Sequence, residues 1–148
     1  GELASTSGVF DKLKNQIKIQ VGKEGLRIEL MERDNSPFYQ VGNPILVPSA
    51  VEVLQRLAVV LQSLPNPITI EGHTDSRQYS TSRQYSNWEL SSDRANSARR
   101  VLEAASLPEG RIDRVIGHAD RIPMVQGDPL DAMNRRISII VRRTGGEP

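Results

Sequence analysis

Five short stretches of the chain are rich in apolar residues that mostly alternate with polar ones, and each predicts a β-strand. They are residues 17–21, 26–31, 68–73, 112–117 and 137–142. Only the short, glycine-containing segment 22–25 separates the first two stretches, so they predict a hairpin.

Three other segments repeat apolar residues at helical spacing. Residues 9–17 predict a short helix, and residues 50–64 and 87–105 predict two longer ones. Two segments are rich in proline, glycine, asparagine and aspartate. The first, 34–48, predicts a long irregular connection, and the second, 119–134, predicts a loop with at most one helical turn.

The residues at the helix starts predict how each longer helix is capped. Pro48 suits the first turn of one helix, and Ser49 with Glu52 has the spacing of a capping box. Ser86 and Glu89 have the same spacing at the start of the other helix. Both helices are therefore expected to begin at local sequence signals.

Strands that alternate with helices in this way place the helices on a face of a mixed sheet. Polar residues at alternate strand positions are consistent with an opposite face that is not covered by helices. The predicted fold class is α+β, a two-layer α/β sandwich with a mixed β-sheet and two main helices on one face.

Composition narrows the classes of function. The chain has 148 residues, 19 basic against 18 acidic residues and no cysteine. The balanced charge argues against general electrostatic binding to nucleic acid, and the absence of cysteine excludes disulfides and thiolate metal sites. No apolar run approaches the roughly 20 residues of a membrane span, so a globular piece is expected.

Two similar turns end two of the predicted strands. Residues 72–75 read Gly-His-Thr-Asp, and residues 117–120 read Gly-His-Ala-Asp. A right-handed crossover between the strands places both turns at one edge of the sheet. The helix from Asn87 is expected to start near that edge, with its N-terminal amides placed to receive an anion.

Arg94 is expected on the side of this helix that faces the sheet, where a buried guanidinium needs a carboxylate partner or a ligand. Asp75 is the obvious candidate. One interpretation is a structural ion pair between Asp75 and Arg94, and spacing alone favours it. The other is a pocket for a zwitterion, whose ammonium meets Asp75 and whose carboxylate meets Arg94.

Other chemistries are less well supported. His73, His118, Asp75 and Asp120 offer metal-ligand atoms, but their spacing matches no zinc signature, and His73 is expected to point away from Asp75. A periplasmic hydrolase using a serine and these histidines lacks a G-x-S-x-G elbow.

The adjacent residues Arg135 and Arg136 precede the last strand. They are either a solvated edge or a second clamp for an anion, and the sequence pattern leaves both interpretations open.

Three segments, taken in order, resemble the OmpA-like peptidoglycan-binding domain. They read EGHTD at 71–75, NWELSSDRA at 87–95 and NRRI at 134–137, and the resemblance covers about residues 26–142. The expanded loop that ends in YSNWELS at 85–91 is similar to the periplasmic domain of flagellar stator proteins of the MotB type. Residues 117–120 depart from the usual Gly-x-Gly turn of the family.

The resemblance implies a non-catalytic module that anchors a motor stator to the cell wall by gripping diaminopimelate of peptidoglycan. Carried over by position, Asp75 and Arg94 would hold the zwitterionic end of that residue. Thr74, Asn87 and one of the two arginines Arg135 and Arg136 would complete the peptidoglycan-binding site. No cofactor and no metal are implied. The alternatives are an envelope-integrity anchor like OmpA or Pal, and the periplasmic hydrolase.

The resemblance also implies an organisation and a location. Residues 1–25 would be an N-terminal linker with a short helix and a strand, 26–143 the binding domain and 144–148 a disordered tail. The whole protein would be a single-pass inner-membrane protein with this domain in the periplasm. It would pair with a MotA-like channel subunit through a transmembrane segment absent from this sequence, and it would act as a homodimer.

Overall fold

The computed structural model describes residues 13–80 and 84–144, and its elements match the predicted strands and the two longer helices. The strands are β1 (Ile17–Val21), β2 (Gly25–Met31), β3 (Ile68–His73), β4 (Ile112–Gly117) and β5 (Arg136–Arg142). The helices are α2 (Pro48–Leu61), α3 (Asn87–Ala105) and one 3₁₀ turn, η1 (Ala132–Asn134).

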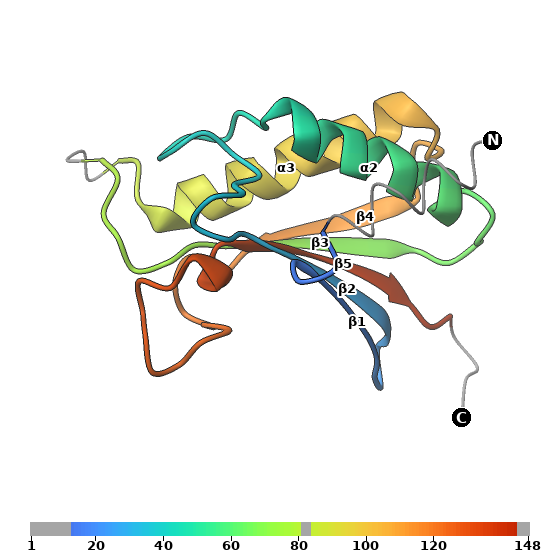
Figure 1. Ribbon diagram of the computed structural model, residues 1–148. Helices are drawn as coiled ribbons and strands as arrows, with labels where there is room; N and C mark the ends of the chain where they lie inside the picture. Colours follow the sequence, from blue (N-terminus) through green and yellow to red (C-terminus); the bar gives the residue numbers. More distant parts are fainter. Residues whose placement is uncertain (1–12, 81–83, 145–148) are drawn as a thin grey trace.

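The five strands form one mixed sheet in the order β1-β2-β5-β3-β4. β3 and β4 are parallel, and every other neighbouring pair is antiparallel. β5 therefore lies in the middle of the sheet. Both α2 and α3 cover the same face, so the two-layer α/β sandwich predicted from the sequence is confirmed (Figure 1).

The core lies between the helices and the covered face of the sheet. Alternate residues of the central strands contribute to it, and Ile70 and Ile139 are fully buried there. Small residues such as Ala95 on α3 allow the helix to approach the sheet closely. A Cβ added at Gly72 would lie 2.0 Å from the carbonyl oxygen of Ser91, so this strand position has no room for a side chain.

The start of α3 is capped as predicted. Ser86 is the N-cap, and its side chain and that of Glu89 form a capping box. The capping box predicted for α2 is wrong: the N-cap is Val47, with no side-chain cap, and Pro48 is at the start of the helix. Proline at the first helical position removes one unpaired N–H and its φ already suits a helix, so α2 begins at Pro48 and both Ser49 and Glu52 lie inside it.

Two predictions fall partly or wholly outside the described residues. The short helix predicted over 9–17 lies mostly within residues 1–12. Of the part that is described, residues 13–16 form a turn and Ile17 begins β1. Of the disordered tail predicted for 144–148, residues 145–148 lie outside the described residues.

Candidate functional site

Asp75 lies two residues beyond β3, and its side chain is fully buried. Its carboxylate accepts hydrogen bonds from three directions. Arg135 Nη1 lies 2.6 Å from Oδ2, and the backbone N–H of Arg77 donates to Oδ1 at 3.0 Å. The hydroxyl of Tyr79 lies within 3.0 Å of both carboxylate oxygens. Asp75 is thus an ionisable group held in place by a cation and two neutral donors.

Arg135 joins this carboxylate to a second one. Its Nε donates to Oε1 of Glu32 at 2.8 Å, and Glu32 directly follows β2. The other oxygen of Glu32 accepts from the backbone N–H groups of Phe38 and Tyr39. Burial alone would lower the pKa of Arg135, but hydrogen bonds to Glu32 and Asp75 raise it above its ordinary value, so the guanidinium is permanently charged.

Arg94 is buried on α3 as predicted, but the expected ion pair with Asp75 is not formed; Asp75 pairs with Arg135 instead. The guanidinium of Arg94 donates to two backbone carbonyls, those of Asn43 and Gln40, each at 3.1 Å. It also lies 4.9 Å above the ring of Tyr39. Burial lowers the pKa of Arg94. Within residues 13–80 and 84–144 no carboxylate forms an ion pair with it.

Tyr79 connects Asp75 to the loop that holds Arg94. A Cβ built on Gly42 would lie 3.1 Å from the Cβ of Tyr79, so the tyrosine packs against the backbone between Gln40 and Asn43. Its hydroxyl meanwhile covers the carboxylate of Asp75. Asp75 and Arg94 therefore flank one aromatic side chain, although they do not contact each other.

Asn87 and Thr74 fix the backbone around Asp75. The side-chain amide of Asn87 donates to the carbonyls of Asp75 and Arg77, at 3.3 and 3.1 Å. The backbone N–H of Thr74 donates to Ala119 at 2.9 Å, which places the two similar turns side by side as predicted. The hydroxyl of Thr74 is buried and has no hydrogen-bond partner among the described residues.

The expectation that the first amides of α3 receive an anion is not supported. The N–H of Trp88 already donates to the side chain of Ser86. The carboxylate of Glu89 accepts from the backbone N–H and hydroxyl of Ser86, at 2.7 and 2.5 Å. The helix end is thus satisfied by its own residues and carries a negative charge of its own.

The two adjacent arginines diverge. Arg135 reaches Asp75, whereas Arg136 is the first residue of β5 and donates to the carbonyl of Ile122 at 2.8 Å. Its Nε lies 3.5 Å from Glu29 Oε1. Adjacent strand residues point to opposite faces of a sheet, which explains why only one of them contacts Asp75.

The four residues considered as metal ligands do not come together as a set. His73 and His118 stack on each other, but the carboxylate beside them is that of Glu71. Asp75 is instead committed to Arg135 and Tyr79. The two turns bring the histidines together, whereas Asp75 lies two residues beyond the end of β3, where its carboxylate bonds to Arg135 and Tyr79.

Three residues of the site were missed from the sequence: Glu32, Tyr39 and Tyr79. Glu32 and Arg135 are 103 positions apart, and a buried glutamate directly after a strand has no local signature. Tyr39 and Tyr79 lie in segments predicted as loops. The one sequence signal that could have pointed to them is that tyrosine is rare, since the chain has only three.

Comparison of the sequence with known proteins identifies a family and a similar relative. The model of the OmpA family matches residues 38–136. Motility protein B of Escherichia coli is 41% identical over 130 residues, which are 87% of this chain and 42% of that relative. The chain therefore spans less than half the length of that relative.

Two solved structures have the same fold. The periplasmic domain of Helicobacter pylori MotB superposes with a TM-score of 0.75 at 19% identity, over 88% of this chain and 84% of that one. The cell wall anchor of the type VI secretion system (T6SS) from Pseudomonas aeruginosa also gives 0.75, at 23% identity, over 96% and 97%.

The helices of the described residues were also compared with the requirements of a membrane span. Within residues 13–80 and 84–144, no helix combines the length and the apolar character that crossing a bilayer would require.

The family match covers about two thirds of the sequence and includes β3, α3 and the turn with Arg135. The chain belongs to the OmpA family, whose members are structural binding modules and not enzymes.

Proposed function

We propose that this chain is the peptidoglycan-binding domain of a flagellar motor stator, and that it anchors the stator to the cell wall. Membership of the OmpA family and the similarity to a motility protein support this role. Residues 26–143 would form the binding domain, with residues 1–25 as an N-terminal linker region whose strand β1 pairs with β2. The domain would lie in the periplasm, below a transmembrane segment that pairs with a MotA-like subunit, and two copies would act together.

The observation that carries the proposal is the state of Arg94. Its guanidinium is buried, yet within the described chain its hydrogen bonds reach only two neutral carbonyls, it stacks on an aromatic ring, and Glu32 acts on it only at longer range. A buried charge without a counter-ion is costly, and an arginine fork matches a carboxylate well. We assign the missing carboxylate to a ligand that binds beside Asp75.

Diaminopimelate in a peptidoglycan stem has the required chemistry, because its free end carries an ammonium and a carboxylate on one carbon. The ammonium would take the place of the Tyr79 hydroxyl on Asp75, while Arg135 keeps its own hydrogen bond to that carboxylate. The carboxylate would meet Arg94. Thr74 has a buried hydroxyl without a partner in the described chain, and we assign it a hydrogen bond to the peptide.

The remaining predicted residues take different roles. Asn87 would position the Asp75 loop through its two bonds to backbone carbonyls. Of the two arginines, we assign Arg135 to the binding site, since Arg136 is bonded to residues on the other side of the sheet. No step in this function requires a reaction, so binding is set by complementarity of charge and shape.

The test is binding to two kinds of purified sacculi, one with diaminopimelate and one with lysine in its stem peptides. Lysine lacks the second carboxylate, so binding to the first kind only is expected. Asp75→Asn and Arg94→Gln should lower that binding at least about tenfold, the loss expected for a charge-assisted contact worth 1.5–3 kcal/mol.

Two controls protect this experiment. Asp120→Asn and Arg121→Gln change exposed residues of the neighbouring turn and should bind like the wild type. Circular dichroism must show that the two site variants remain folded. Equal binding to both kinds of sacculi would contradict the assignment of diaminopimelate. Failure of the gene to restore swimming in a strain without its stator would instead contradict the motor role.

A further inference from the structure

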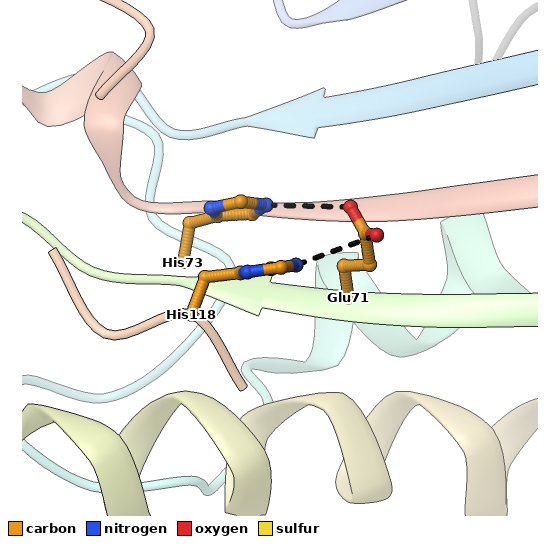
Figure 2. A group of neighbouring side chains, drawn as sticks. All are labelled: Glu71, His73 and His118. Carbon is orange, nitrogen blue, oxygen red and sulfur yellow. Dashed lines mark ion pairs between the residues drawn. The ribbon is translucent and has the colours of Figure 1, made fainter. Parts of the chain in front are cut away.

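A second cluster of ionisable side chains lies on the face of the sheet opposite the helices. Glu71 and His73 are alternate residues of β3, and His118 directly follows β4. Because β3 and β4 are parallel neighbours, the second histidine comes beside the first. Figure 2 shows all three side chains on the side of β3 away from α3. The cluster is therefore separate from the Asp75 site.

The three side chains converge. The two imidazole rings are stacked, with centroids 4.7 Å apart and planes inclined by 14°. Both rings turn their Nε2 atoms toward the carboxylate of Glu71, at 3.3 Å from His118 and 3.7 Å from His73 (Figure 2). One ligand atom from each residue lies within 4.8 Å of the other two.

The histidine nitrogens beside Glu71 are buried and form no hydrogen bonds within the described chain. Neither ring nitrogen of His73, nor Nε2 of His118, has a hydrogen bond among the described residues. The side chain of His73 is only 2% exposed. A buried polar atom without a partner costs free energy, and such atoms in a native protein usually mark a bound water, an ion or a catalytic role.

The residue types in the cluster suit a divalent transition metal, since two imidazoles and one carboxylate converge. Neutral imidazole and ionised carboxylate are the forms that ligate divalent transition metals.

Two arginines on this face would lower the affinity for a cation, but neither donates a hydrogen bond to the histidines. Arg27 Nη1 lies 3.2 Å from Glu71 Oε1, but its guanidinium also bonds to Glu24 and Glu29 and keeps those partners if Glu71 turns away. Arg136 lies beside Glu29 at 3.5 Å.

Hard cations such as Mg²⁺ and Ca²⁺ need more oxygen ligands than one carboxylate offers, whereas Zn²⁺ accepts nitrogen and oxygen together.

We propose that Glu71, His73 and His118 bind one Zn²⁺ ion or a similar transition-metal ion through two imidazole nitrogens and one carboxylate oxygen. Water would take the remaining position. The ion would join the end of β3 to the turn after β4, next to Thr74 and Asp75.

The test is a titration of the 148-residue chain with Zn²⁺ in competition with a chromophoric chelator. One ion per chain with micromolar affinity is expected. The chain has only two histidines and no cysteine, so imidazole ligation can arise only here. The ring-proton signals of both histidines should shift together in the NMR spectrum of the wild-type protein as Zn²⁺ is added.

Variants locate the site. Glu71→Gln and His118→Gln should weaken Zn²⁺ binding at least about tenfold. The side chain of His118 is 22% exposed, so its substitution is compatible with the fold, and circular dichroism checks this. Glu109→Gln, an exposed carboxylate elsewhere, should bind like the wild type. No binding by the wild type, unshifted histidine signals or unchanged affinity in both site variants would each overturn the proposal.

Discussion

The hydroxyl of Tyr79 lies 3.0 and 2.9 Å from the two carboxylate oxygens of Asp75 and covers them both. The same ring packs against Gly42, in the loop that holds Arg94. Burial and the hydrogen bond to Asp75 both raise the pKa of Tyr79, so its hydroxyl keeps its proton and acts as a donor. A ligand ammonium that binds Asp75 must compete with this hydroxyl.

Tyr79→Phe removes that competitor. Because a hydrogen bond contributes about 0.5–1.5 kcal/mol, affinity for free diaminopimelate should rise about twofold to tenfold, and unfolding stability should fall by a similar free energy. Isothermal titration calorimetry and urea denaturation measure the two quantities. A fall in affinity would mean that the hydroxyl binds the ligand and does not compete with it.

Arg135→Ala is expected to destabilise the fold by about 3–5 kcal/mol, because it leaves the buried carboxylates of Asp75 and Glu32 without their shared cation. Arg121→Ala, at an exposed position, should change stability by less than about 0.5 kcal/mol. Urea denaturation of both variants checks this. A loss below about 1 kcal/mol for Arg135→Ala would show that the two carboxylates find other partners.

Gly72→Ala tests the close approach of α3 to β3. The added Cβ would lie 2.0 Å from a backbone oxygen, which cannot move without moving the helix. A loss of about 2–3 kcal/mol is expected from such overpacking. Gly127→Ala is the matched control, since a Cβ there meets nothing within 4 Å. Similar thermal melting of the two variants would contradict the packing that the structure describes.

Glu89 predicts a pH dependence of the start of α3. Hydrogen bonds from Ser86 lower the pKa of its carboxylate below the usual 4.5. The unfolded chain then binds the proton at a higher pH than the folded one, so the stabilisation is complete above pH 4.5 and is lost as the pH falls through the folded-state pKa.

The matched variant is Glu89→Gln, which keeps the shape of the capping box without its charge. The stability difference between wild type and variant should shrink as the pH falls below 4.5, measured by urea denaturation at several pH values. An NMR titration gives the carboxyl pKa directly. A difference that grows on acidification would have the wrong sign and would contradict this account.

How much could be predicted from sequence depended on the distance over which each interaction acts. The capping box of Ser86 and Glu89 spans three residues, so the sequence displays it directly. Strand alternation placed Glu71 and His73 on one face correctly. For α2 a valid local signal at Ser49 was overridden by Pro48, because two local rules competed for the same helix end.

The partner of Asp75 was beyond reach of such rules. Arg135 lies 60 positions away, and only the folded sheet brings the two together. Arg94 was correctly placed in the interior, but its partners are backbone carbonyls, which every residue has and no sequence pattern distinguishes. Residue types thus indicated which groups are special, and the tertiary fold determined which ones meet.

The central position of β5 has a consequence for the order of assembly. Among the strands of the described residues it is the last in the sequence, yet within the sheet it alone joins the β1-β2 hairpin to the β3-β4 pair. Until residues 136–142 are synthesised, the edges of β2 and β3 that pair with β5 in the complete sheet have no partner strand. Such edges are where chains aggregate, so the nascent domain is most vulnerable immediately before it is complete.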